Sequence, residues 1–173
     1  MQSNSVESNS VESNSVQNHL FNLNGDVLAD SYQPIGEDGV LPAGDVLLTV
    51  AQLDQLSQIS GKKAVLLTVN DSPETLSLPL AELDLIAIQF AAFADGRGYS
   101  FATLLRRQGF KGELRAVGDV FKDVIFYLKR CGFDSFALKE GKDLEVAKAG
   151  LHDFTAGYQA ATATPDSHYQ LGR

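Results

Sequence analysis

Continuous apolar runs alternate with helix-type patterns through the middle of the chain. Four such runs, over residues 64–69, 84–90, 113–117 and 134–138, end abruptly at polar or glycine-containing segments. This pattern is typical of parallel strands that are buried on both faces. Strands that alternate with helices predict a mainly parallel sheet with right-handed crossovers. The predicted fold is a single α/β domain, with helices flanking a sheet of about four to five strands; part of a β/α barrel is the alternative that the pattern leaves open.

Helical periodicity fills the segments around these runs. Apolar residues recur there at a spacing of about 3.6 residues, and glycines follow the last of them. Helices are predicted over residues 45–59, 100–107, 119–131 and 144–154, with a short connector or single helical turn over 78–83. Ser100 and Asp119 are expected to cap the second and third of these helices, because their side-chain oxygens can accept hydrogen bonds from the first turn.

Both ends of the chain differ from this alternating region. A polar five-residue repeat runs through residues 1–17 and is expected to be disordered, because it cannot bury enough apolar surface to offset its ordering entropy. Residues 18–45 form a loop-rich lead-in, with one short strand expected at 27–30. The α/β domain is then predicted over residues 46–158, and a flexible tail over 159–173.

Composition is that of an ordinary globular protein. Of the 173 residues, 44% are apolar and 21% are charged. No apolar run approaches the roughly 20 residues of a membrane helix, and the N-terminus lacks the pattern of a secretory signal. A cytoplasmic protein without a membrane partner is therefore expected. The single cysteine, Cys131, allows no intramolecular disulfide, and the spacing of His, Cys and carboxylate residues indicates neither a metal site nor a bound cofactor.

The charge of the chain is unevenly distributed. The net charge of −8 argues against nucleic-acid binding. Residues 1–95 hold 13 acidic residues and 2 lysines, whereas residues 96–173 hold 9 acidic residues and 12 Lys and Arg. The first part therefore has a net charge of −11 and the second of +3. The excess cations either lie on solvated helix faces or form a basic face for an anionic ligand or an acidic partner.

One rim of the predicted sheet gathers the polar side chains. The carboxyl ends of parallel strands meet at one edge, where ligands of α/β proteins bind. The residues expected along this rim are Asp71, Asp95, Arg97, Ser100, Asp119 and Lys139. Segment 95–100 places two glycines, an arginine and a serine before a predicted helix, and backbone N–H groups beside a fixed positive charge suit a small anion. The candidate binding residues are Asp95, Gly96, Arg97, Gly98, Tyr99, Ser100 and Asp119, with Arg115 and Arg130 as support.

Segment 96–101 also begins like the dinucleotide-binding fingerprint G-x-G-x-x-G. Phe101 stands where the third glycine belongs, although Asp119 follows at about the spacing of a ribose-binding acid. The competing interpretation is a tight turn in which the glycines adopt positive φ and Arg97 pairs with Asp95 or Asp119.

Catalytic interpretations are weaker than structural ones at the remaining positions. Asp95 and Asp119 can act as an acid–base pair, but capping is the commoner role for such residues. Cys131 is expected to be a buried structural residue rather than a nucleophile, since the end of a helix is negative. The three histidines are far apart in sequence and form no Ser/His/Asp set. The residues therefore name no reaction and favour a binding role over an enzymatic one.

The ordered motifs between Asp95 and Phe133 resemble the bacterial family known as domain of unknown function 934. They occupy residues 95–100, 104–106, 109, 112–120 and 126–134, and the likeness extends over about residues 84–159. The resemblance implies a place in sulfur assimilation, because such proteins are typically encoded beside the sulfite reductase hemoprotein. It implies a partner rather than a mechanism, since one cysteine cannot hold a four-cysteine iron–sulfur cluster.

These observations lead to one expected function and two alternatives. The chain is expected to be an accessory protein of assimilatory sulfite reduction, which binds the reductase, an electron donor or a small oxyanion through the basic glycine-containing loop. The alternatives are a nucleotide-dependent oxidoreductase and a structural scaffold without a ligand.

Overall fold

The computed structural model describes residues 19–36, 39–74, 76–92, 95–154, 157 and 159–163. The five-residue repeat of residues 1–17 and most of the predicted tail, from residue 164 onward, lie outside the described residues. The predictions of disorder and flexibility for these segments therefore stay predictions.

A seven-stranded mixed sheet forms the centre of the fold. Its strands are β1 (Leu20–Asn22), β2 (Gln33–Pro34), β3 (Val46–Thr49), β4 (Lys63–Leu67), β5 (Leu85–Phe90), β6 (Glu113–Gly118) and β7 (Ser135–Leu138). The strand order is β1-β7-β6-β5-β4-β3-β2. Only β1 pairs in the antiparallel direction, with β7, and all other neighbouring strands are parallel. The sheet is thus larger than the four to five strands predicted, because the lead-in adds β1 and β2 at its two edges and residues 46–49 form β3 instead of part of a helix.

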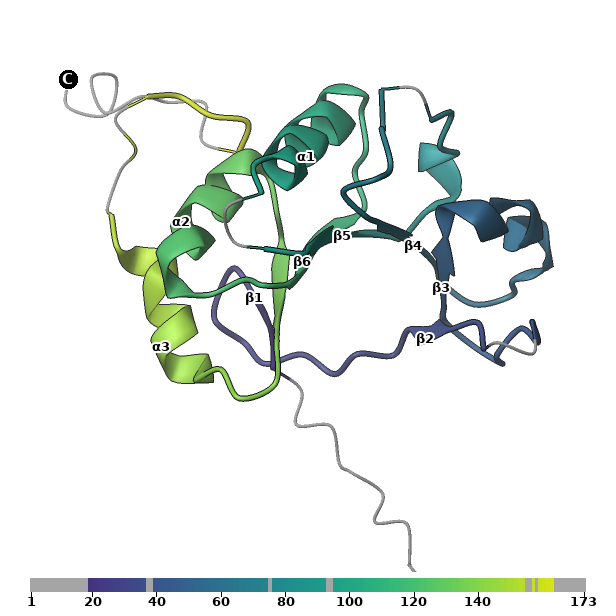
Figure 1. Ribbon diagram of the computed structural model, residues 1–173, viewed down its shortest axis with the longest axis horizontal. Coiled ribbons are helices and arrows are strands. Elements are labelled where there is room, and N and C mark those ends of the chain that lie inside the picture. The colour runs from purple at the N-terminus through teal and green to yellow at the C-terminus, as the bar shows by residue number, and fades with distance from the viewer. Residues whose placement is uncertain are drawn as a thin grey trace, which may run out of the picture.

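Strands β2 to β7 lie side by side in chain order, and this order determines which face of the sheet the helices cover. Each right-handed crossover advances the chain by one strand in the same direction, so the connecting helices fall on one face of the sheet. The connecting helices are α1 (Arg97–Arg107), α2 (Lys122–Cys131) and the 3₁₀ helices η1 (Val50–Gln58) and η2 (Leu80–Glu82). The helix α3 (Leu144–Ala149) and the 3₁₀ helix η3 (Gly150–His152) follow the last strand and pack on α2. Figure 1 shows α1 and α2 above a sheet that curls rather than lying flat. The barrel alternative fits this arrangement, since the curled sheet describes half of a β/α barrel.

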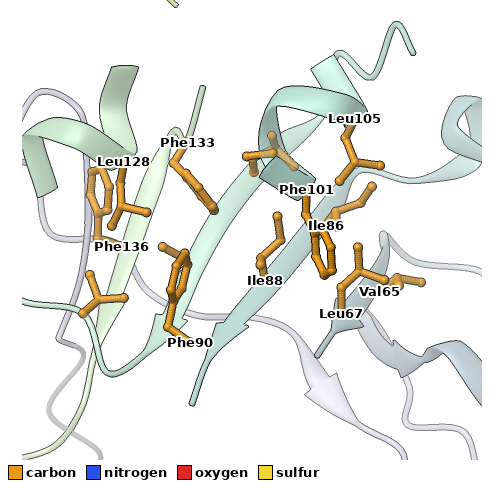
Figure 2. Close-up of a cluster of buried hydrophobic side chains, with 14 of the residues drawn as sticks. Val65, Leu67, Ile86, Ile88, Phe90, Phe101, Leu105, Leu128, Phe133 and Phe136 are labelled. Atoms are coloured by element: carbon orange, nitrogen blue, oxygen red, sulfur yellow. The ribbon is translucent and has the colours of Figure 1, made fainter. Parts of the chain in front are cut away.

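The main core fills the space between the sheet and the helices (Figure 2). Ile86 and Ile88 project from β5 towards this side, where they join Phe101 and Leu105 of α1 and Leu128 of α2. All five side chains are buried, and each contributes about 1.5–3 kcal/mol of hydrophobic stabilisation. The apolar positions on α1 and α2 recur three or four residues apart, as a helix that covers a sheet requires.

The opposite face of the sheet is crossed by the lead-in (Figure 1). Ala64, Leu85 and Ala87 form a second apolar cluster there, and the ring of Tyr32 from the lead-in packs against it. Burial raises the pKa of the Tyr32 phenol to about 12, and nearby carboxylates such as that of Asp84 add to the shift. Tyr32 therefore ties the described part of the lead-in to this face of the sheet.

Two predicted elements are wrong near the N-terminus. The segment predicted as one helix over 45–59 divides into β3 and η1, because Val46 and Leu48 are buried as a strand that pairs in parallel with β4. Thr49 and Gln52 form a capping box at the start of η1. The strand predicted at 27–30 is absent, and only Val27 forms an isolated bridge to Phe21.

The two predicted helix caps are also wrong. Gly96 is the N-cap of α1 and Ser100 lies inside the helix, while Phe121 is the N-cap of α2 and Asp119 precedes it by two residues. Neither a glycine nor a phenylalanine offers a side-chain oxygen to the first turn, so neither N-cap residue provides a side-chain cap. The other predicted strands and helices are confirmed, with ends that shift by a few residues. Within the described part of the chain, no helix is long and apolar enough to cross a bilayer.

Candidate functional site

The carboxylate of Asp95 occupies the N-terminus of α1. Asp95 Oδ1 accepts a hydrogen bond from the backbone N–H of Arg97 at 3.1 Å and from Arg97 Nε at 3.0 Å, and Oδ2 pairs with Nη2 at 2.8 Å. These hydrogen bonds, with the positive charge of Arg97, hold the pKa of the Asp95 carboxyl below its usual range. The helix start, where sequence analysis expected an anionic ligand, thus carries an anion of the chain itself.

Arg97 also joins α1 to the loop after β4. Its Nη1 donates to the backbone oxygen of Val69 at 2.9 Å, so three of its nitrogens have protein acceptors. Its side chain is nevertheless 57% exposed. The result is a positive charge that is fixed in place and faces solvent, at the carboxyl end of neighbouring strands.

Packing explains the two glycines of the fingerprint-like segment. Neither has a positive φ, so the left-handed turn is wrong, whereas the pairing of Arg97 with Asp95 that went with it is confirmed. Gly96 has open space around it, whereas a Cβ on Gly98 would lie 2.5 Å from Cζ of Phe90. Phe101, at the place of the third glycine, is buried in the core. The packing of α1 on β5 therefore explains why Gly98 and Phe101 stand at these positions.

The other rim residues satisfy local partners. The Asp71 carboxylate accepts hydrogen bonds from the backbone N–H of Thr68 at 2.7 Å and from its hydroxyl at 2.8 Å, which closes the turn after β4. Asp119 pairs with Nζ of Lys139 at 3.8 Å, which links the loops after β6 and β7. The loops after β4, β5, β6 and β7 thus bring polar groups to one rim of the sheet, as predicted. Two contacts join different loops, namely Arg97 with the Val69 carbonyl and Asp119 with Lys139.

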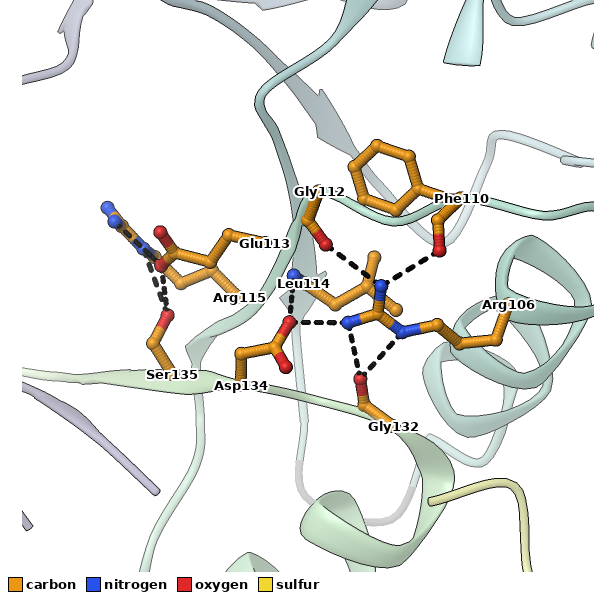
Figure 3. Close-up of polar contacts among 9 residues, drawn as sticks. All are labelled: Arg106, Phe110, Gly112, Glu113, Leu114, Arg115, Gly132, Asp134 and Ser135. Atoms are coloured by element: carbon orange, nitrogen blue, oxygen red, sulfur yellow. Dashed lines mark hydrogen bonds and ion pairs between the residues drawn. The ribbon is translucent and has the colours of Figure 1, made fainter. Parts of the chain in front are cut away.

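Arg115 lies on the other face of the sheet, away from this rim. Its side chain is only 6% exposed and forms ion pairs at 2.9 Å with Glu113 and with Asp30 of the lead-in. Its guanidinium also lies over the ring of Tyr32, 5.6 Å from the centroid, and Glu113 in turn accepts a hydrogen bond from Ser135 (Figure 3). The carboxylate partner that a buried arginine requires is therefore present twice. This network fastens the lead-in to β6.

A second arginine network was missed by sequence analysis. Arg106, at the end of α1, donates to the backbone oxygens of Phe110 at 3.0 Å, Gly112 at 2.8 Å and Gly132 at 2.9 Å, and pairs with the Asp134 carboxylate (Figure 3). It holds together the ends of α1 and α2 and the start of β6. The sequence carries no signal for it, since Arg106 and its neighbour Arg107 look alike and carbonyl acceptors have no residue signature.

A groove runs between α1 and α2 on the outer surface. One part is a cavity of about 250 Å³, and a second part of about 570 Å³ extends to residues 159–162. Both parts are lined by Thr103, Arg107, Tyr127 and Cys131, so they form one depression, which we call the α1–α2 groove. Tyr99, Ser100 and Leu104 complete the first part, and Arg130 the second.

The chemistry of the α1–α2 groove is cationic and aromatic. Tyr99 and Tyr127 meet edge to face, with ring centroids 4.9 Å apart. Burial raises the pKa of the Cys131 thiol, and hydrogen bonds with Tyr127 and Thr103 and the charge of Arg130 oppose this shift only in part. Cys131 is thus kept as a neutral thiol, which agrees with its expected structural role.

The structure distributes the candidate residues over three places. Asp95, Gly96, Arg97, Gly98 and Asp119 belong to the rim, Arg115 lies beneath the lead-in, and Tyr99, Ser100 and Arg130 line the α1–α2 groove. The sequence pattern indicates where the strands end but not how the two helices pack, so these residues were predicted to share one surface. Among the described residues, no group of three or more His, Cys, Asp or Glu side chains is placed to hold a metal ion.

Comparison with known protein families identifies the family of the chain. A family model described as a bacterial protein of unknown function (DUF934) matches residues 64–169, which is more than half of the chain. The matched region runs from β4 through α3 and contains every candidate binding residue. No curated protein matches the chain.

Proposed function

We propose that this chain, which belongs to the DUF934 family of bacterial proteins, is an accessory protein of assimilatory sulfite reduction that binds the sulfite reductase hemoprotein in the cytoplasm. The partner and the pathway come from the family's typical association with that hemoprotein. The contact surface comes from the geometry around Arg97.

The observation that carries the proposal is the exposed but fixed guanidinium of Arg97. Asp95 holds two of its nitrogens and the Val69 carbonyl a third, while its side chain stays 57% exposed. Arginine is enriched at the centres of protein interfaces, and a side chain that is already fixed loses little entropy on binding. Arg97 therefore suits contact with an acidic surface of a partner.

The charge distribution supports the same mode of binding. Residues 96–173 carry a net charge of +3 in a chain whose total is −8. Such a basic half favours partners with an acidic surface, and the resulting affinity falls as salt screens the charges. A protein partner is favoured over a small oxyanion, because the Asp95 carboxylate at the helix start repels a free anion there.

The test is the affinity between the purified chain and the hemoprotein of the same organism, measured at low and at high salt. Saturable binding that weakens with salt is expected, and Arg97→Ala is expected to weaken it by about tenfold. Lys62→Ala is the matched control, because Lys62 is also an exposed cation but lies in the acidic half of the chain. Absence of binding in the micromolar range, or equal affinity for Arg97→Ala in a folded protein, would contradict the proposal.

A further inference from the structure

We infer that the α1–α2 groove is a docking site for an acidic, non-helical segment of a partner protein. The inference deepens the proposed function, because it assumes that the chain binds another protein. It does not depend on which protein that is.

Charge complementarity selects an acidic occupant. Arg107 and Arg130 both line the groove, and neither part of it is lined by an aspartate or a glutamate. Among the described residues, Arg107 has no ion-pair partner, and its side chain is exposed at the meeting point of the two parts. A carboxylate bound there would gain a charge-assisted hydrogen bond without displacing an existing one.

The end of α2 already holds one non-helical segment, which shows how a peptide backbone can be bound. Arg130 Nη2 donates to the backbone oxygen of Gln159 at 2.6 Å, and the backbone N–H of Ala163 donates to the backbone oxygen of Arg130 at 3.2 Å. Residues 159–162 thereby form one wall of the groove. Among the described residues, none fills the part between this wall and α1, which leaves room for a second segment.

Arg130 contributes its positive charge to the groove rather than a free donor. Its Nε is buried and has no acceptor among the described residues. The chain covers this nitrogen, because a Cβ added to Gly157 would lie 2.9 Å from it, so a ligand in the groove would meet the charge of Arg130 and not its Nε.

The aromatic pair in the groove provides the apolar part of the contact. Tyr127 is 52% exposed although it packs edge to face on Tyr99. Exposed tyrosines that neighbouring groups hold in place are frequent anchors at interfaces. The first part of the groove, of about 250 Å³, offers room beside this pair for a side chain of the partner.

The test is an NMR titration of the ¹⁵N-labelled chain with an acetylated and amidated pentapeptide, Glu-Glu-Tyr-Glu-Glu. The matched control peptide has Gln in place of each Glu. Saturable shifts of the amide signals of α1 and α2 are expected, with affinity for the Gln peptide at least about fivefold lower. Arg107→Gln is expected to weaken binding of the acidic peptide about three- to tenfold, and Lys62→Gln to leave it unchanged.

Equal affinity for the two peptides, an unchanged affinity in Arg107→Gln, or shifts confined to other elements would overturn the inference. Arg107→Gln leaves the fold intact, because the exposed side chain bonds to no described group. The result is separable from the proposed function. A groove that binds the acidic peptide in a protein that does not bind the hemoprotein refutes only the partner, whereas a hemoprotein complex without peptide binding refutes only the groove.

Discussion

Gly98 of α1 lies against the ring of Phe90 at the end of β5, so close that a Cβ on the glycine would be 2.5 Å from Cζ. The ring cannot move away easily, because it is buried and packs on Tyr99 and Phe133, with centroids at 5.3 and 5.9 Å. This contact sets the distance between α1 and the sheet. It also explains Gly98 by packing, whereas the sequence alone suggested that this glycine belongs to a ligand-binding loop.

Gly98→Ala is therefore expected to lower the free energy of unfolding by about 1–3 kcal/mol, because the methyl group overpacks the core. The higher helix propensity of alanine, about 1 kcal/mol, offsets only part of this loss. Gly96→Ala is the matched control, since Gly96 has no atom within 4 Å of the added Cβ and an ordinary φ of −74°. Urea denaturation of both variants checks the prediction, and equal stabilities would show that the Phe90 contact is not limiting.

Arg106 and Arg107 are adjacent in sequence but are expected to differ strongly in their effect on stability. Arg106→Met removes the donor to three backbone oxygens and leaves Asp134 without its cation. The free energy of unfolding should fall by about 2–4 kcal/mol, because these acceptors are partly buried. Arg107→Met should change it by less than about 0.5 kcal/mol, as is usual for an exposed side chain. Thermal melting of the two variants side by side would reveal a similar loss if the Arg106 network is unimportant.

The Asp95 carboxyl is expected to titrate below its ordinary pKa of 3.8, chiefly because of the hydrogen bonds from Arg97. A group whose pKa is lower in the folded state stabilises the fold above the unfolded-state pKa, and this contribution is lost as the pH falls through the folded-state pKa. Arg97→Ala should return the Asp95 pKa towards 3.8. Following the carboxyl ¹³C signal of Asp95 between acidic and neutral pH measures both values, and an unshifted midpoint in the wild type would argue against the pair.

Cys131 is expected to react slowly with alkylating reagents, because burial raises its pKa above the ordinary value of 9.0. The rate should increase with pH beyond that value, as the thiolate forms. Tyr127→Phe should shift the pH profile to still higher pH, since the hydrogen bond with the Tyr127 hydroxyl lowers the thiol pKa. Alkylation rates of wild type and Tyr127→Phe over a pH series check this. Rapid reaction at neutral pH would instead indicate a reactive thiol.

Local patterns predicted the central elements well. The four apolar runs became β4, β5, β6 and β7, and Gly132 ends α2 with a φ of +106°, as a helix-stopping glycine should. The failures lie where local and tertiary preferences conflict. Val46 to Thr49 fits the spacing of a helix, but pairing with β4 makes it a strand. Gln33 and Pro34 have no strand pattern and join the sheet only because β3 lies beside them.

The sequence by itself determined which segments are strands or helices in the centre of the chain and how unevenly the charge is distributed. These features follow from periodicity and composition, which act within short stretches. Only the tertiary structure decided that the helices share one face, that Arg97 reaches Val69, and that α1 and α2 enclose a cationic groove. Each of these depends on contacts between segments that are distant in sequence, and such contacts are set by how whole elements pack rather than by any local pattern.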